Sequence, residues 1–280
     1  MKDLKWACET LPTVHLYEDP SSKTLNLREI AGYLQTKFGK ILVDIRGPLM
    51  TAGPENLETL ARKIAGTKVR DPMNPITWAE PLPGEIEFER KLLSNPTLRL
   101  TGILYDGFRL QEVARGLLLG DEFGIEHAHI VFTNRLFGTW DEGDRRYHAR
   151  VSVYGFPSLI STTGIVEAPA KPKGYYVLKQ RYAAFGAHIP LEVLKEKFRE
   201  KFIDYDDERL TEVMKGYVMQ ALFYHIFGEP FCGDRRCRLF NSHWQEEVLE
   251  AQLSEPEFCE RHAKTLEGLS RTRQAFQDNP

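Results

Sequence analysis

Three of the four cysteines and one histidine fall in two close pairs near the end of the 280-residue chain. Cys232 and Cys237 form the first pair, and Cys259 and His262 form the second. Thiolates and imidazoles are the ligands of closed tetrahedral zinc sites, which are commonly built from two short-spaced pairs. The spacing therefore predicts one structural Zn²⁺ held by these four side chains. The alternative, three unrelated buried thiols and a surface histidine, does not account for the clustering.

The elements that must position this site are expected to be helical. Apolar residues recur at helical spacing from about residue 206, Gly228 suits a left-handed C-terminal cap, and Pro230 prevents continuation. Two further helices are expected near residues 243–252 and 256–268. The zinc would then fasten this helical hairpin to the end of the long helix.

Strand and helix signals alternate upstream of that helix. Strands are expected at 13–17, 40–45, 98–105, 128–132 and 146–154, helices at 26–38, 55–64, 108–119 and 190–201, and a proline-rich loop at 68–85. Strands interleaved with helices predict an α/β layered part over residues 1–205. A helical, zinc-stapled subdomain over 206–280 completes what we expect to be one compact domain.

Residues 210–266 resemble the archaemetzincin metallopeptidases. That family has the zinc helix H-E-x-x-H-x-x-G-x-x-H-C, followed by x4-C-x-M and later by F-C-x-x-C. Here residues 221–232 read ALFYHIFGEPFC, residues 233–239 read GDRRCRL, and residues 258–262 read FCERH. The four structural-metal positions match, with His262 in place of the last cysteine. The resemblance implies a metzincin-like mixed sheet with helices, within a group described as metallopeptidases related to archaemetzincins.

The catalytic positions of that family are mostly changed. Ala221 and Leu222 stand where the first histidine and the glutamate belong, and Phe231 replaces the third histidine. Leu239 replaces the methionine, so His225 is the one ligand position that keeps its histidine. Peptide hydrolysis on zinc needs three firm ligands and a proton acceptor, so no second, catalytic Zn²⁺ is expected. His225 is a candidate catalytic residue, or else a core histidine with a hydrogen-bond partner.

Two other segments are candidates for substrate contact. The strand at 146–154 places His148 and Arg150 on one face, where they could bind a peptide carboxylate or simply meet solvent. Residues 158–172 carry few charges and could form the edge strand that pairs with a peptide in metzincin-like folds, or an ordinary connection. Glu167 would be the carboxylate nearest that cleft. The acidic turn at 136–144 is a weak candidate for a hard-cation site.

Composition restricts the function classes. A net charge of −3 and the lack of a basic, aromatic stripe argue against a nucleic-acid partner. No apolar run has the length of a signal peptide or a membrane span, so a cytoplasmic protein with no membrane partner is expected.

The sequence favours a catalytically inactive metallopeptidase homologue that binds a peptide or protein partner. The alternative is an active zinc-dependent peptidase with a non-standard metal site, built from His225 with His148, His129 or Glu167. A zinc module that binds nucleic acid is a third hypothesis, which the acidic composition disfavours.

Overall fold

The computed structural model describes residues 11–277, apart from residues 52, 54, 76–79, 100 and 187. Its main sheet has the strand order β2-β1-β4-β8-β7. These strands are β1 (Thr13–Tyr17), β2 (Val43–Arg46), β4 (His127–Thr133), β7 (Ser152–Val153) and β8 (Ser158–Ser161). All neighbours in this sheet pair in parallel except β7, which runs antiparallel to β8.

A second, smaller sheet has the order β3-β5-β6. It consists of β3 (Leu104–Asp106), β5 (Leu136–Asp141) and β6 (Arg146–Arg150). β3 is parallel to β5, and β6 is antiparallel to it. The expected mixed α/β fold class is therefore confirmed among the described residues.

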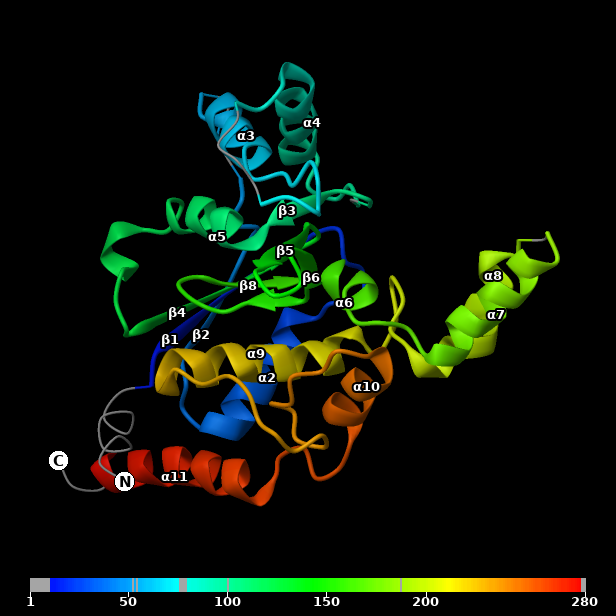
Figure 1. Ribbon diagram of the computed structural model, residues 1–280. Helices are drawn as coiled ribbons and strands as arrows, with labels where there is room; N and C mark the ends of the chain where they lie inside the picture. The colour runs from blue at the N-terminus through cyan, green and yellow to red at the C-terminus, as the bar shows by residue number, and fades with distance from the viewer. Residues whose placement is uncertain are drawn as a thin grey trace.

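Helices cover both faces of the main sheet (Figure 1). On one side lie α2 (Leu27–Phe38) and α9 (Leu210–Phe227), and on the other side α5 (Gly107–Arg115), with α3 (Leu57–Ala65) and α4 (Pro83–Ser94) beyond it. Val14 and Ile130 belong to the core that includes α2 and α9, whereas Tyr17 and Val131 belong to the core beneath α5. Because strand side chains alternate, His15 and His129 also face the α5 side.

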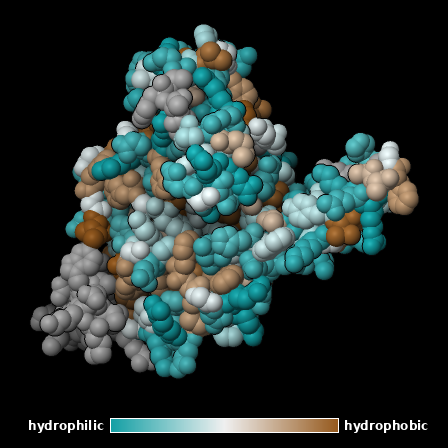
Figure 2. Space-filling model, viewed as in Figure 1, coloured by the Kyte–Doolittle hydropathy of each residue, from teal (hydrophilic) through white to brown (hydrophobic). Residues whose placement is uncertain are grey.

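The remaining helices surround the end of α9 or project from the body. They are α6 (Gly164–Glu167), α7 (Lys173–Ala184), α8 (Leu191–Phe198), α10 (Gln245–Leu253) and α11 (Glu260–Gln277), with short 3-10 turns at Gly120–Glu122 and Arg199–Lys201. α7 and α8 form an arm that stands away from the rest (Figure 1), and Figure 2 shows hydrophobic side chains at its end. Phe185 on this arm is 88% exposed.

Local signals predicted several elements well. β1 has the expected bounds, and the Asn26 side chain accepts hydrogen bonds from the backbone of Arg28 and Glu29 at the start of α2. Gly228 ends α9 in the left-handed conformation, with φ of 75°. Other expectations were wrong: α4 begins inside the expected loop, α7 was not anticipated, and the strand expected at 98–105 is only β3.

The predicted division at residue 205 does not correspond to a gap in the core. The largest hydrophobic cluster contains Val14 of β1, Val218 of α9 and Leu266 of α11. None of the described helices combines the length and apolar character needed to cross a bilayer.

Candidate metal centre and cleft

The two cysteine pairs converge at the end of α9. Cys232 follows the α9 cap, and its backbone N–H donates to the Leu239 carbonyl at 2.7 Å, which closes a tight loop around Cys237. Cys259 lies directly before α11 and His262 lies in its first turn. One ligand atom of each of these four side chains lies within 4.8 Å of the other three.

The distances within this cluster suit a tetrahedral metal. The sulfurs of Cys232 and Cys259 are 3.8 Å apart, and His262 Nδ1 lies 3.5 Å from Cys237 Sγ and 3.2 Å from Cys259 Sγ. A zinc tetrahedron with Zn–S bonds of about 2.3 Å has S···S edges of about 3.8 Å. The residues therefore fit a Cys₃His zinc site, and the cluster is compatible with one metal ion.

The protonation states of these ligands depend on burial. Burial raises the pKa of Cys237 to about 12, so a metal cation is needed to hold this sulfur as thiolate at neutral pH. Burial lowers the pKa of His262, which keeps the imidazole neutral and able to donate its lone pair. The Cys237 thiol must therefore lose its proton when a metal binds, whereas the lowered pKa of His262 reduces competition from protons for the imidazole.

Two buried glutamines connect residues 232–239, the metal loop, to the neighbouring helices. The carbonyl of Arg238 accepts hydrogen bonds from Gln220 Nε2 of α9 at 3.1 Å and from Gln252 Nε2 of α10 at 3.0 Å. Gly216 makes the close approach of α9 and α10 possible, because a Cβ there would lie 1.6 Å from Gln252 Oε1. The loop, α9 and α10 therefore pack as one unit.

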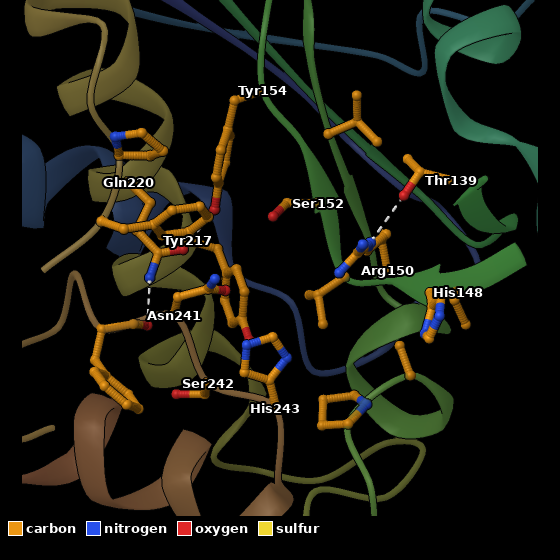
Figure 3. A pocket seen from close by; sticks show the side chains of 18 of the residues that line it. Thr139, His148, Arg150, Ser152, Tyr154, Tyr217, Gln220, Asn241, Ser242 and His243 are labelled. Carbon is orange, nitrogen blue, oxygen red and sulfur yellow. Dashed lines mark hydrogen bonds between the residues drawn. The ribbon is translucent and has the colours of Figure 1, made fainter. Parts of the chain in front are cut away.

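A cleft of about 890 Å³ runs beside α9. Figure 3 shows its two walls: His148 and Arg150 of β6 on one side, and Tyr217 and Gln220 of α9 on the other. Residues 240–244, which follow the metal loop, complete the lining. No Asp or Glu is among the described residues that line this cleft.

The α9 wall is fixed by hydrogen bonds. The Tyr154 hydroxyl donates to Gln220 Oε1 at 2.5 Å, and Gln220 Nε2 also donates to the Phe240 carbonyl at 3.1 Å. Burial raises the pKa of Tyr154 far above its usual value, so the phenol stays protonated and can donate. Gln220 is thus fully engaged in holding the wall.

The face of α9 that lines the cleft is not the face that carries the family's first histidine and glutamate positions. Gln220 and Tyr224, four residues apart, line the cleft. Ala221 and Leu222, at the family's histidine and glutamate positions, are 2% and 0% exposed within the main core. Because one residue corresponds to about 100° of helix rotation, the two sets of side chains lie on different faces.

His225 is not among the residues that line this cleft. Its Nε2 donates to the Ile125 carbonyl at 2.7 Å, and burial lowers its pKa. It lines a separate hollow of about 580 Å³ with Phe123 and Phe156. Among the described residues, some histidine, cysteine and carboxylate side chains lie close enough to one another to share a metal ion. His225 belongs to none of these groups. Its pairing with His148, His129 or Glu167 is therefore not formed.

His148 and Arg150 do lie in the cleft. His148 Nε2 is 2.8 Å from the Asp144 carboxylate, and Arg150 Nε donates to Thr139 Oγ1 at 3.0 Å. One ligand atom each of Asp141, Asp144 and His148 also lies within 4.8 Å of the others. In this acidic turn, however, the Asp141 carboxylate already accepts from the backbone of Gly143 and Asp144.

Of the two alternatives for residues 158–172, the edge strand that pairs with a peptide is not formed. Residues 158–161 form β8, which lies between β4 and β7, so the edge strands beside the cleft are β6 and β7 instead. Glu167 belongs to α6, where its carboxylate accepts a hydrogen bond from the Tyr205 hydroxyl. Residues 168–170 line the cleft in its place.

Sequence reasoning missed the side chains that shape the α9 wall. Tyr154, Gln220, Tyr224 and His243 line the cleft and were not singled out. The signal available was the i, i+4 spacing of Gln220 and Tyr224, two polar side chains in the mostly apolar stretch of α9 that follows Lys215.

Comparisons with known proteins found similarity to a protein family and to a solved structure. The crystal structure of archaemetzincin from Methanopyrus kandleri is similar, with 14% identity, 94% of this chain and 96% of that chain covered, and a TM-score of 0.43. A search of the curated proteins found no significant match. A family model described as "Probable metallopeptidase family (DUF6775)" matches residues 10–269. Because that match spans nearly the whole chain, the protein belongs to this family of probable metallopeptidases.

Proposed function

We propose that this chain is a metallopeptidase homologue that binds peptides in the cleft between β6 and α9 without cleaving them. We further propose that one structural zinc, held by Cys232, Cys237, Cys259 and His262, fastens the wall of that cleft. The observation that carries the proposal is the cleft lining: α9 presents Gln220 and Tyr224 there, and no described lining residue is a carboxylate.

The lining does not fit a catalytic metal. A catalytic zinc needs three protein ligands and an open position for water, and hydrolysis needs a group that accepts a proton from that water. The imidazoles among the described lining residues are His148 and His243, and His148 is beside Asp144 at 2.8 Å. No hydrolytic step is therefore derived for this cleft.

The same lining suits binding. Its volume is on the scale of ligand sites, about 300–1,000 Å³. β6 and β7 are edge strands, and an extended peptide can add to such an edge through its main chain. Arg150 supplies positive charge to the lining, whereas Arg146 lies 3.7 Å from the Asp144 carboxylate, so a peptide carboxylate is expected to meet Arg150.

A peptide library tests both halves of the proposal. The purified protein is expected to retain peptides rich in acidic groups and to release no fragments, with or without a chelator. Arg150→Gln should weaken this binding at least tenfold, whereas Arg181→Gln, a matched change of an exposed arginine on α7, should not. Chelator-sensitive cleavage would overturn the claim of inactivity, and failure to retain any peptide would overturn the claim of binding.

The active-peptidase alternative makes a different prediction about metal content. It requires a second zinc whose binding depends on His225. If a His225→Ala variant lost both one zinc equivalent and the cleavage activity of the wild-type protein, that result would support the active-peptidase alternative.

A further inference from the structure

Three histidines gather on the sheet face opposite α9. His15 of β1 lies between His127 and His129 of β4, with ring centroids 5.2 Å and 4.6 Å apart, and each pair of rings is stacked. The parallel register places His15 directly beside both His129 and Asp44. One ligand atom each of His15, His129 and Glu122 lies within 4.8 Å of the other two.

The outer nitrogens of two of these rings are held by other side chains. His15 Nδ1 lies 3.2 Å from Asp44 Oδ2, and His129 Nδ1 lies 3.0 Å from the Tyr17 hydroxyl. In metal sites, a ligating histidine typically bonds through its second nitrogen to a carboxylate or another polar group, which fixes the ring. In this cluster the held atom is Nδ1 of both rings, so Nε2 is the atom of each ring that would bind a metal, in exchange for its present hydrogen-bond partner.

Those Nε2 atoms meet polar partners of the same cluster. His15 Nε2 lies 2.9 Å from His127 Nδ1, and His129 Nε2 lies 3.2 Å from the Glu122 carbonyl. His15 and His129 are 3% and 2% exposed, so water is largely excluded from both rings. Burial lowers the pKa of His129 to about 4, so this ring is neutral at pH 7. Because a carbonyl only accepts, His129 Nε2 carries the ring proton in this bond and must pass it to Nδ1, where the Tyr17 oxygen can accept a hydrogen bond, when a metal binds.

The carboxylate of Glu122 is oriented by Arg46. The guanidinium donates to Glu122 Oε1 at 2.5 Å and to Oε2 at 2.7 Å, and to Asp44 Oδ2 at 2.6 Å. Two carboxylates against one guanidinium give a formal charge of −1 beside the imidazoles. A divalent cation at this point would therefore be favoured by charge as well as by ligand type.

We propose that His15, His129 and Glu122 form a second metal site, which takes a divalent transition metal of the class that prefers imidazole in exchange for the hydrogen bond between His15 and His127. Zinc, nickel, cobalt and iron belong to that class. Nitrogen ligands of a tetrahedral metal are about 3.3 Å apart, so the three donors must draw together by up to about 1.5 Å. Binding through Glu122 also requires its carboxylate to exchange one of its two hydrogen bonds to Arg46 for the metal.

This site is separate from the peptide cleft and from the cysteine site. α9 packs on the other face of the sheet, where Val14 and Ile130 meet it, and none of the three proposed ligands lines the cleft. The inference therefore does not depend on the proposed function.

Metal counting on the full-length, reduced protein tests the site. The wild-type protein is dialysed with zinc or cobalt, passed through a desalting column, and analysed by mass spectrometry for metal. Two equivalents per chain are expected. His129→Gln and Glu122→Gln should each lose one equivalent, whereas the matched changes His225→Gln and Glu112→Gln should keep both.

Cobalt distinguishes the two sites by spectrum. The cysteine site should give an intense thiolate-to-cobalt band, whereas the histidine site should add only weak visible bands that vanish in Glu122→Gln. Circular dichroism checks that the variants remain folded. One metal equivalent per chain in the wild-type protein would overturn the proposal, and this result does not depend on whether any variant folds. Two metal equivalents that persist in both His129→Gln and Glu122→Gln would overturn it as well.

Discussion

The sulfur atoms of Cys232 and Cys259 lie 3.8 Å apart although 27 residues separate them along the chain. This contact joins the end of α9 to the beginning of α11. The carbonyl of Arg238, directly after Cys237, also accepts a hydrogen bond from Gln220, the residue that shapes the cleft wall. A metal at the cysteines would therefore stabilise the cleft wall as well as the C-terminal helices.

Cys259→Ser is expected to remove one zinc equivalent and to loosen α10 and α11. Structural zinc contributes on the order of 10–16 kcal/mol in small peptides, which is comparable to the whole stability of a typical domain, about 5–15 kcal/mol. Zinc analysis and hydrogen exchange of residues 245–277 measure the effect. Cys8→Ser, which changes the one cysteine outside the cluster, is the control. Unchanged zinc content in Cys259→Ser would contradict the assignment.

Gly216→Ala is expected to destabilise the protein by about 1–3 kcal/mol, because the new Cβ would fall 1.6 Å from the buried Gln252 Oε1 and force α9 and α10 apart. Gly32→Ala is the matched control on α2, where a Cβ meets nothing within 4 Å. That change should stabilise the protein by up to about 1 kcal/mol, through the better helix propensity of alanine. Urea unfolding measures both, and equal effects of the two changes would refute the close packing.

The cysteine site could be predicted from sequence because its information is local. Each pair lies within six residues of chain, and zinc chemistry explains why the pairs should meet. The phase of α9 could not be predicted in this way. Whether residue 220 or 221 faces the cleft depends on how the helix packs against α2 and α10, and a difference of one residue moves the side chain to another face.

The histidine cluster shows the other limit. His15 and His127 are 112 residues apart, and only the pairing of β1 with β4 makes them neighbours. Nothing in the spacing of the sequence indicates which strands pair, so the cluster had no local signal. α7 escaped detection for a related reason, since its apolar residues do not form a clear stripe and several are exposed.

Gln220→Leu is expected to cost about 1–3 kcal/mol of stability and to weaken peptide binding. The change leaves the Tyr154 hydroxyl without its acceptor and removes a donor from the carbonyls of Arg238 and Phe240. Gln35→Leu, an exposed position on α2, is the matched control and should change neither property. Unfolding curves and peptide titrations give the two readouts. Normal peptide affinity in Gln220→Leu would show that the α9 wall does not contribute to binding.

His225 is expected to make the stability depend on pH in the mildly acidic range. Burial lowers its pKa in the folded protein, whereas the unfolded chain titrates near 6.5. The unfolded chain therefore takes up a proton first, and the stability that His225 contributes above pH 6.5 is lost as the pH falls towards the folded-state pKa.

A His225→Gln variant isolates this contribution. Glutamine keeps an N–H donor for the Ile125 carbonyl but does not titrate in this range, and effects of acid on the cysteine site are common to both proteins. The free energy of unfolding of the wild-type protein, relative to the variant, should therefore decrease between pH 7.5 and pH 5. A difference that stays constant would mean that His225 titrates normally in the folded protein, and one that grows in acid would mean that folding raises its pKa. Either result would contradict the burial of its imidazole and reopen its role as an accessible catalytic group.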